Sequence, residues 1–249
     1  MRIDVFTLFP EMVDAPLALS IVGRARSTGA LDLRIHDIRN WTNDVHRTAD
    51  DSPYGGGAGM VMRADPIVRG VDEVIESVAT RPRILILSAG GPLFTQSMAV
   101  DLAAEEHLIL VAGHYEGIDD RVRQLLEAEE LSIGDYVLTG GELAAAVVID
   151  TIARLLPGVI NAESTRSESH GSEIGGLVEY PQFTRPATYR GLAVPDVLLS
   201  GNHAAIAQWR ENESVAKTRR NRPELLSPKA ATRYAPERPD TTSRSETVD

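Results

Sequence analysis

The chain has 249 residues, a formal net charge of −11 and no cysteine, which excludes disulfides, thiolate metal sites and a thiolate nucleophile. Its hydrophobic content of 43% suffices for a buried core, and it lacks an apolar run of ~18 residues that could span a membrane. The N-terminus also lacks the pattern of a signal peptide. We therefore expect a cytoplasmic protein of one large domain or two small ones.

Segments typical of strands and helices alternate along residues 1–160. Strands are indicated by alternating or continuous apolar residues, and helices by apolar residues three and four apart, with Pro10 and Asp65-Pro66 as helix starts and Thr95 as an N-cap. In chain order we expect strand 3–9, helix 11–27, strand 31–36, a glycine-rich loop 50–60, helix 65–79, strand 83–87, helix 95–106, strand 107–112, helix 119–129 and helix 141–156. This alternation predicts an α/β fold with a mostly parallel sheet covered on both faces.

The composition changes after Pro157. Residues 161–176 are polar, rich in Gly and Ser and without period, which indicates a linker or loop, and the Pro-, Thr- and Ser-rich residues 227–249 indicate a disordered tail. Between them Asn202 can cap a helix that reaches about Lys217. Basic residues outnumber acidic ones by seven to three in 210–233, although the net charge argues against a nucleic-acid partner. The alternative interpretation of these basic residues is a solvated helix face that binds no partner.

Two segments of unusual composition lie close together in the chain. Residues 113–122 read GHYEGIDDRV and residues 132–143 read SIGDYVLTGGEL. Each is associated with an apolar run that resembles a buried strand, 107–112 for the first and 136–138 inside the second. Ligands bind at strand ends of α/β sheets, where glycines let them approach free backbone groups, so the two segments predict one small-molecule pocket made mainly of main chain. In isolation the same glycines would indicate only tight turns.

Several other kinds of site are excluded by spacing. The glycine run 55–59 is not followed by Lys and Ser or Thr, so it is not a P-loop, and the sequence contains neither G-x-G-x-x-G, G-x-S-x-G nor H-E-x-x-H. The six histidines show no ligand spacing, and we expect no metal held by histidines.

At this point the chain resembles a known family, the bacterial tRNA (guanine-N1)-methyltransferases, or TrmD family, of the SPOUT superfamily. The resemblance runs from Met1 to about Leu226, and seven segments carry it in the same order: DVFTLFPEM, DDSPYGGGAGMVM, GHYEGIDDRV, SIGDYVLTGGEL, DTIARLLPGV, FTRP and LLSGNHAAIAQWR.

The resemblance implies methyl transfer from S-adenosylmethionine to N1 of guanosine 37 in tRNA, next to the anticodon. It implies a SPOUT-type α/β domain with a deep trefoil knot in residues 1–160 and a flexible linker in 161–176. A small helical tRNA-binding domain follows in 177–226. It also implies a homodimer whose active sites are shared between subunits. A requirement for Mg²⁺ stays open. Ribosomal RNA or a ribose hydroxyl as target is a rival, which the linker and the FTRP match disfavour.

The resemblance also implies individual roles. The arginine that the family uses in catalysis corresponds to Arg154, and the family's general base, an aspartate, corresponds to Glu168. Because alignment through a loop is ambiguous, Glu163 and Glu173 are alternatives for the base. The residues that would bind the methyl donor are Leu87, Ser88, Gly113, Tyr115, Glu116, Gly117, Ile133, Gly134, Tyr136, Leu138, Gly140 and Gly141.

Three further positions depart from the family. His114 stands where arginine is usual, Ala144 where proline is common, and SAGGP at 88–92 replaces SPQGR. The aspartate-to-glutamate change at Glu168 raises a second alternative, a non-catalytic RNA-binding relative that keeps the fold and pocket. The run PYGGGAGM and the basic residues Arg210, Lys217, Arg219 and Arg220 are the expected tRNA contacts.

Overall fold

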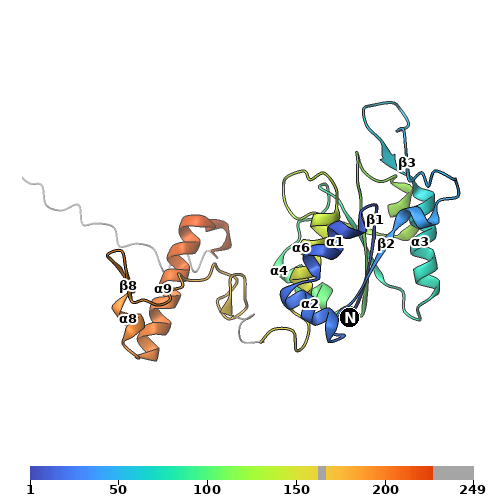
Figure 1. The fold of residues 1–249 in the computed structure, drawn as a ribbon. Coiled ribbons are helices and arrows are strands. Elements are labelled where there is room, and N and C mark those ends of the chain that lie inside the picture. The colour runs from blue at the N-terminus through green and yellow to red at the C-terminus, as the bar shows by residue number, and fades with distance from the viewer. Residues whose placement is uncertain (162–166, 227–249) are drawn as a thin grey trace, which may run out of the picture. The chain divides into compact units, whose positions relative to one another are not determined.

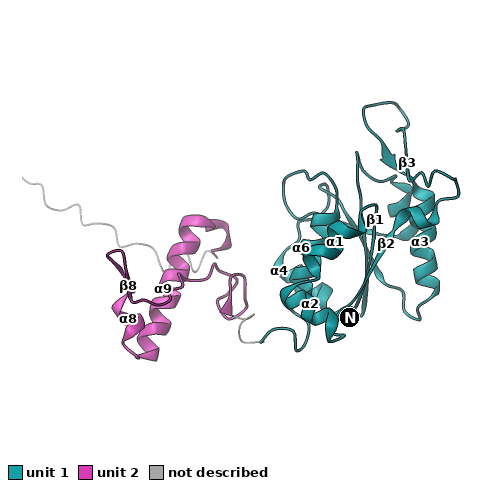
Figure 2. Ribbon diagram, viewed as in Figure 1, with its two compact units in different colours: residues 1–162 teal, residues 163–249 magenta. Residues whose placement is uncertain are grey.

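A computed structural model describes residues 1–161 and 167–226. The chain divides into two compact units, Met1–Ala162 and Glu163–Asp249, which are described separately below (Figures 1 and 2). The predicted tail 227–249 and residues 162–166 of the predicted linker lie outside the described residues. Within the described part of the chain, no helix combines the length and apolarity needed to cross a membrane.

A five-stranded parallel sheet forms the centre of the first unit, in the order β2-β1-β6-β5-β7. The central strand β6, with the sequence HLILVA, is almost wholly buried because it has a strand on each side and helices on both faces. The prediction of a mostly parallel α/β sheet is therefore confirmed. Its strands are β1 (Arg2–Thr7), β2 (Asp32–Asp37), β5 (Arg83–Leu87), β6 (His107–Ala112) and β7 (Glu129–Leu131).

Helices cover both faces of this sheet (Figure 1). Side chains alternate along β5, so that Leu85 and Leu87 join one core cluster and Ile84 and Ile86 join the other. The first cluster packs against α1 (Pro10–Leu17), α2 (Ser20–Ser27), α4 (Gln96–Ala103) and α6 (Glu142–Ala153). The second packs against the 3-10 turn η1 (Ile38–Trp41), α3 (Ala64–Glu76) and α5 (Arg121–Leu126).

The single helix predicted for residues 11–27 is wrong, because the structure has two helices there. Pro16 lies inside α1 and offers no amide to continue the helical hydrogen bonds. The chain then becomes extended at Leu19 (φ −114°, ψ 168°) before α2 begins. Periodicity alone missed this break because both helices direct apolar residues to the same core cluster.

Two predictions between residues 119 and 138 are also wrong. The helix expected to reach residue 129 ends at Leu126, and Glu127 is left-handed with φ 52°. The next residues form β7, whose first residue Glu129 receives two hydrogen bonds of 2.7 and 2.8 Å from the guanidinium of Arg83 on β5. Residues 136–138, expected as a strand, belong to a loop in which the side chain of Val137 is 86% exposed.

The glycine-rich loop is the tip of a two-stranded arm. Strands β3 (Asp50–Asp51) and β4 (Val61–Met62) pair antiparallel and hold residues 52–60 at the end of the arm, which projects from the first unit (Figure 1). Tyr54 at this tip is fully exposed.

The second unit is built around the long helix α9 (His203–Asn221), whose N-cap Asn202 accepts a hydrogen bond from the amide of Ala205, as its sequence predicts. Two α9 side chains hold the backbone of Val178: Thr218 accepts from its amide at 2.9 Å, and Ser214 donates to its carbonyl at 2.6 Å. The described residues of this unit also form the β8 (Thr188–Tyr189) and β9 (Leu192–Ala193) hairpin, α8 (Asp196–Leu199) and the 3-10 turn η2 (Pro223–Leu225).

Candidate active site

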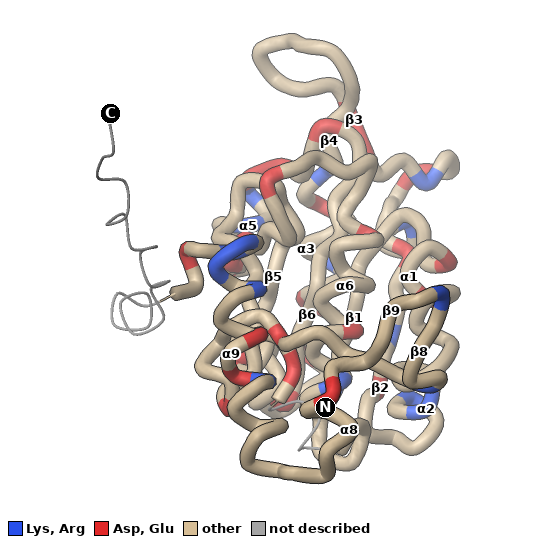
Figure 3. Tube along the Cα trace, turned by 90° about the vertical axis from the view of Figure 1, so that its left-hand side faces the viewer, with Lys and Arg blue, Asp and Glu red and all other residues tan. Residues whose placement is uncertain are grey.

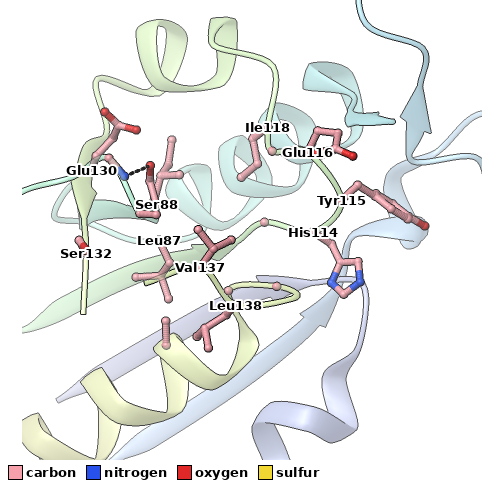
Figure 4. A pocket seen from close by; sticks show the side chains of 18 of the residues that line it. Leu87, Ser88, His114, Tyr115, Glu116, Ile118, Glu130, Ser132, Val137 and Leu138 are labelled. Carbon is pink, nitrogen blue, oxygen red and sulfur yellow. Dashed lines mark hydrogen bonds between the residues drawn. The ribbon is translucent and has the colours of Figure 1, made fainter. Parts of the chain in front are cut away.

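A cavity of about 420 Å³ lies where three neighbouring parallel strands end (Figure 4). The last residues of β5, β6 and β7 are in register, with Leu87 opposite Ala112 and Leu131. The loops that leave these strands line the cavity. All twelve residues expected to bind the donor are among the lining residues: Leu87, Ser88, Gly113, Tyr115, Glu116, Gly117, Ile133, Gly134, Tyr136, Leu138, Gly140 and Gly141.

The three loops are held together by main-chain contacts. The amide of Gly141 donates to the carbonyl of Gly113 at 2.7 Å, and the amide of Ser132 donates to the carbonyl of Pro92 at 2.9 Å. A Cβ atom on Gly141 would lie 2.9 Å from Cα of Ala112, so only glycine allows the start of α6 to pack against the end of β6. The walls of the cavity are therefore positioned by backbone rather than by large side chains.

Tyr115 adopts a left-handed backbone conformation with φ 59°. For a residue other than glycine this conformation costs roughly 1–2 kcal/mol. The surrounding bonds maintain it, since the amide of Glu116 donates to Met60 at 3.0 Å and the amide of Gly117 donates to His114 at 3.3 Å. Backbone strain of this kind is concentrated at binding and catalytic sites.

Carboxylates predominate among the charged groups of the cavity. Glu116, Asp119, Asp120 and Glu130 line it, together with one arginine, Arg123, which pairs with Asp120 at 2.9 Å. Hydrogen bonds from Arg121 lower the pKa of Asp119, so this carboxylate is ionised at neutral pH. The lining therefore favours a ligand with positive charge.

A buried polar cluster supports the wall near His114. The side chain of Glu142, at the start of α6, is fully buried, and its Oε1 accepts a 2.8 Å hydrogen bond from the hydroxyl of Thr7. Its Oε2 lies 3.5 Å from Nδ1 of His114. The His114 ring also packs against Phe9 with ring centroids 4.8 Å apart. The imidazole of His114 thus lies beside a buried carboxylate, and Nδ1 of His114 and Oε2 of Glu142 are buried without a hydrogen-bond partner among the described residues.

The arm formed by β3 and β4 is anchored to the same wall. The amide of Met62 donates to the carbonyl of Gly117 at 2.9 Å, and the amide of Asp119 donates to the carbonyl of Met62 at 3.0 Å. A Cβ atom on Gly59 would overlap the side chain of Glu116, which shows how closely the glycine-rich tip approaches this lining residue. The arm and the cavity therefore form one connected structure.

The two expected catalytic residues, Arg154 and Glu168, belong to different units. Arg154 is the half-buried C-cap of α6 and is not among the residues that line the cavity. Glu168 is half-buried in the second unit, and its carbonyl accepts from the amide of Gly171 at 2.8 Å. Of the alternatives, Glu173 is exposed in a turn and Glu163 lies outside the described residues.

Sequence reasoning missed one charged wall of the cavity. Glu130 lies on β7, which was expected to be the end of a helix, and a strand of three residues gives too short a pattern to be detected. Asp119, Asp120 and Arg123 stand within or beside the GHYEGIDDRV segment but were not singled out. No group of three or more His, Asp or Glu among the described residues is arranged to hold a metal ion.

An all-parallel sheet with a glycine-lined, acidic cavity at its carboxyl edge is typical of α/β proteins that bind a small ligand at this edge. The family model described as tRNA (Guanine-1)-methyltransferase TrmD matches residues 1–228, and the chain belongs to this family.

Relatives in several bacteria share this similarity, and each is named tRNA (guanine-N(1)-)-methyltransferase. A relative from Thermomicrobium roseum is 57% identical over 232 residues, which are 93% of this chain and 85% of the relative. Relatives from Geobacillus kaustophilus and Dehalococcoides mccartyi are 51% and 49% identical, over 91% of this chain in each case and 91% and 90% of their own lengths.

Proposed function

We propose that this protein transfers a methyl group from S-adenosylmethionine to N1 of guanosine 37 in tRNA, next to the anticodon, and that it acts in the cytoplasm. Family membership over residues 1–228 supports the reaction and the tRNA substrate. The observation that carries the proposal is that all twelve expected donor-binding residues line one cavity at the ends of β5, β6 and β7.

The charges of this cavity fit the donor. S-adenosylmethionine carries a sulfonium and an ammonium group against one carboxylate, and Glu116, Asp119 and Glu130 supply negative charge around it. Gly113, Gly134 and Gly140 line the cavity, and their backbone groups can form hydrogen bonds with adenine and ribose, since these residues carry no side chain of their own. When bound, the donor supplies an electrophilic methyl group.

The acceptor needs help from the protein because guanine N1 carries a proton at neutral pH. We assign Glu168 as the base that takes this proton while the N1 electron pair forms the bond to the methyl carbon. The bond between sulfur and the methyl carbon breaks in the same step, and its electron pair stays on sulfur, so that S-adenosylhomocysteine leaves as the neutral thioether. We assign Arg154 as the cation that stabilises the negative charge moving toward O6. A general base contributes about 10²–10⁴ in rate, and fixed charges near the transition state add a comparable factor.

A homodimer with shared active sites is the proposed assembly. Exposed apolar side chains next to the cavity support it: Val137 is 86% exposed in the cavity loop, and Leu143 and Val147, one turn apart on α6, are 48% and 46% exposed. Large apolar side chains exposed on one helix face are typical of a protein interface. Val147→Asp should shift the mass measured by light scattering from dimer to monomer and reduce methylation; an unchanged mass would exclude α6 from the interface.

We further propose that residues 1–160 contain the SPOUT knot, that 161–176 link the two domains and that 177–226 bind tRNA. The close main-chain packing of the three cavity loops supports the first assignment, because a Cβ on Gly91 would lie 2.5 Å from the Leu131 amide nitrogen and one on Gly141 would touch Ala112. Basic residues at the end of α9, Arg219 and Arg220, support the last (Figure 3).

Methylation by the purified protein tests the reaction. Incubation with labelled donor and a tRNA that carries guanosine at position 37, with and without magnesium, should yield 1-methylguanosine. Donor binding without this product would instead support a non-catalytic RNA-binding protein, and absence of donor binding would overturn the proposal.

The catalytic assignments are tested by a matched series. Glu168→Ala should lower turnover by about 10²–10⁴-fold with donor affinity unchanged, while Glu173→Ala, in the same segment, should retain activity. Arg154→Ala should lower turnover in the same way. Full activity of Glu168→Ala, with loss in Glu163→Ala or Glu173→Ala, would transfer the role of base to that residue.

A further inference from the structure

The second unit contains a groove of about 700 Å³ that is separate from the cavity of the first unit. Its walls are formed by the segment 180–187 and by residues of α8 and α9. This volume falls in the range of ~300–1,000 Å³ that is typical of small-ligand sites. The chemistry of its lining indicates what it holds.

Three aromatic side chains meet in this groove. The ring of Trp209 on α9 neighbours those of both Tyr180 and Phe183, with centroid distances of 6.5 and 6.2 Å. Phe183 is 47% exposed, although aromatic residues of this size are usually buried when they serve only a core. The rest of the apolar wall is formed by Pro181, Ala187, Val194, Leu198, Leu199 and Ile206. The groove therefore offers flat apolar surface to solvent.

The charged residues of the groove are both basic. Arg185 and Arg210 line it, and among the described residues no aspartate or glutamate does. The guanidinium of Arg210 lies 4.8 Å from the centroid of the Tyr180 ring, and this stacking holds the cation beside the aromatic surface. This differs from the carboxylate-rich cavity of the first unit.

We propose that this groove binds an unpaired nucleobase of the RNA substrate, with Phe183 and Trp209 stacking on the base and Arg185 and Arg210 contacting the adjoining phosphates. Aromatic side chains combined with arginines are the means by which proteins bind unstacked bases, because each base has a π-face and each nucleotide a negative charge. The inference rests on the proposed function and adds a second site of nucleic-acid recognition, one that performs no chemistry.

Fluorescence of Trp209 gives a direct test in the full-length protein. The chain has two tryptophans, Trp41 and Trp209, so Trp41→Phe leaves Trp209 as the reporter. A single-stranded oligoribonucleotide of about eight residues should quench this fluorescence, because base stacking brings the two rings together, and a duplex of the same length should quench it far less. Equal quenching by both would show that the groove does not select unpaired bases and would overturn the proposal.

Substitutions separate stacking from general packing. Phe183→Ala and Phe183→Leu should each weaken single-strand binding by about 5- to 150-fold, the effect expected for one base-stacking contact, whereas Phe183→Trp should retain it. Tyr189→Ala is the matched control, since Tyr189 is also exposed, at 60%, and also lies next to an arginine, Arg190, but does not line the groove. Circular dichroism confirms that each variant is folded.

Methylation assays keep this inference distinct from the proposed function. If the protein methylates tRNA but Phe183→Leu binds and methylates it like the parent, the groove has no role in RNA binding and the inference is wrong. The opposite result is that single strands quench the fluorescence of Trp209, that Phe183→Leu abolishes this quenching, and that the unsubstituted protein does not methylate tRNA. In that case the inference stands and the catalytic proposal fails. If Phe183→Ala changes only the oligomeric state, a second copy of the chain occupies the groove, which also overturns the inference.

Discussion

Gly91 offers a direct test of how tightly the donor cavity is assembled. It lies in the turn after β5, and a Cβ atom added there would lie 2.5 Å from the amide nitrogen of Leu131 and 2.7 Å from the carbonyl carbon of Glu130. Ordinary contacts between such atoms are about 3.5–4.0 Å, so backbone on one side must move by about 1 Å. The three-residue strand β7 carries both of the residues that would be displaced.

The expected cost follows from this overlap. Extra methyl groups in closely packed regions destabilise proteins by about 1–3 kcal/mol, and a unit of this size loses about 2–4 °C in Tm per kcal/mol. Gly91→Ala should therefore lower Tm by about 2–12 °C. Because Ser132 and Ile133 follow directly after β7 and line the cavity, the same displacement should weaken binding of S-adenosylmethionine.

Gly90→Ala is the matched control from the same turn. The atom nearest to its added Cβ is Oγ of Ser88 at 3.6 Å, an ordinary contact. Its Tm should be unchanged or slightly higher, because alanine restricts the unfolded chain. Scanning calorimetry gives Tm and titration calorimetry gives donor affinity. Equal Tm values for the two variants would refute the close packing of this turn on β7.

Three further outcomes are expected. Burial would raise the pKa of Asp4, but hydrogen bonds from His36, Arg2 and His107 lower it far below its usual range. The ionised Asp4 therefore stabilises the fold fully above pH ~4, and this stabilisation is lost as the pH falls below that value. Asp4→Asn should lower the free energy of unfolding at neutral pH by about 3–5 kcal/mol and make it depend less on pH in acid. Thr218→Val leaves the amide of Val178 without its acceptor and should destabilise the second unit by about 1–3 kcal/mol, seen as faster hydrogen exchange at Val178; unchanged exchange would contradict this role. Donor at about 100 times its Kd should stabilise the first unit by about 2.7 kcal/mol; an unchanged melting temperature at this concentration would contradict binding in the cavity.

The buried strands and capped helices could be predicted from the sequence because local signals and tertiary packing agree there. Residues 83–87 and 107–112 are continuous apolar runs and form β5 and β6 with the expected bounds. Thr95 accepts the capping hydrogen bond of α4 from Met98, as its position suggests. The expected donor residues share one cavity because the loops that carry them follow strands that are neighbours in the sheet.

Other features depend on long-range contacts and have no local signature. The strand β7 forms by backbone pairing with β5 at the sheet edge, where Arg83 also bonds Glu129, 46 positions away in the chain. The buried Glu142 is stable because Thr7, 135 positions away, donates to it. The groove of the second unit joins residues 180–187 with α9, and neither segment alone predicts it. Sequence spacing cannot reveal such pairs, since it reports only neighbours along one element.

The strand order has a consequence for synthesis on the ribosome. During synthesis β1 can pair with β2 as soon as β2 has emerged. The other edge of β1 stays unpaired until β6 has been made, since Arg2 lies opposite His107. At about 5–20 residues per second, the intervening stretch takes about 5–20 s to emerge. For that interval an apolar strand edge is open to unwanted association, so nascent chains stalled before residue 107 should be the forms of this protein that chaperones retain.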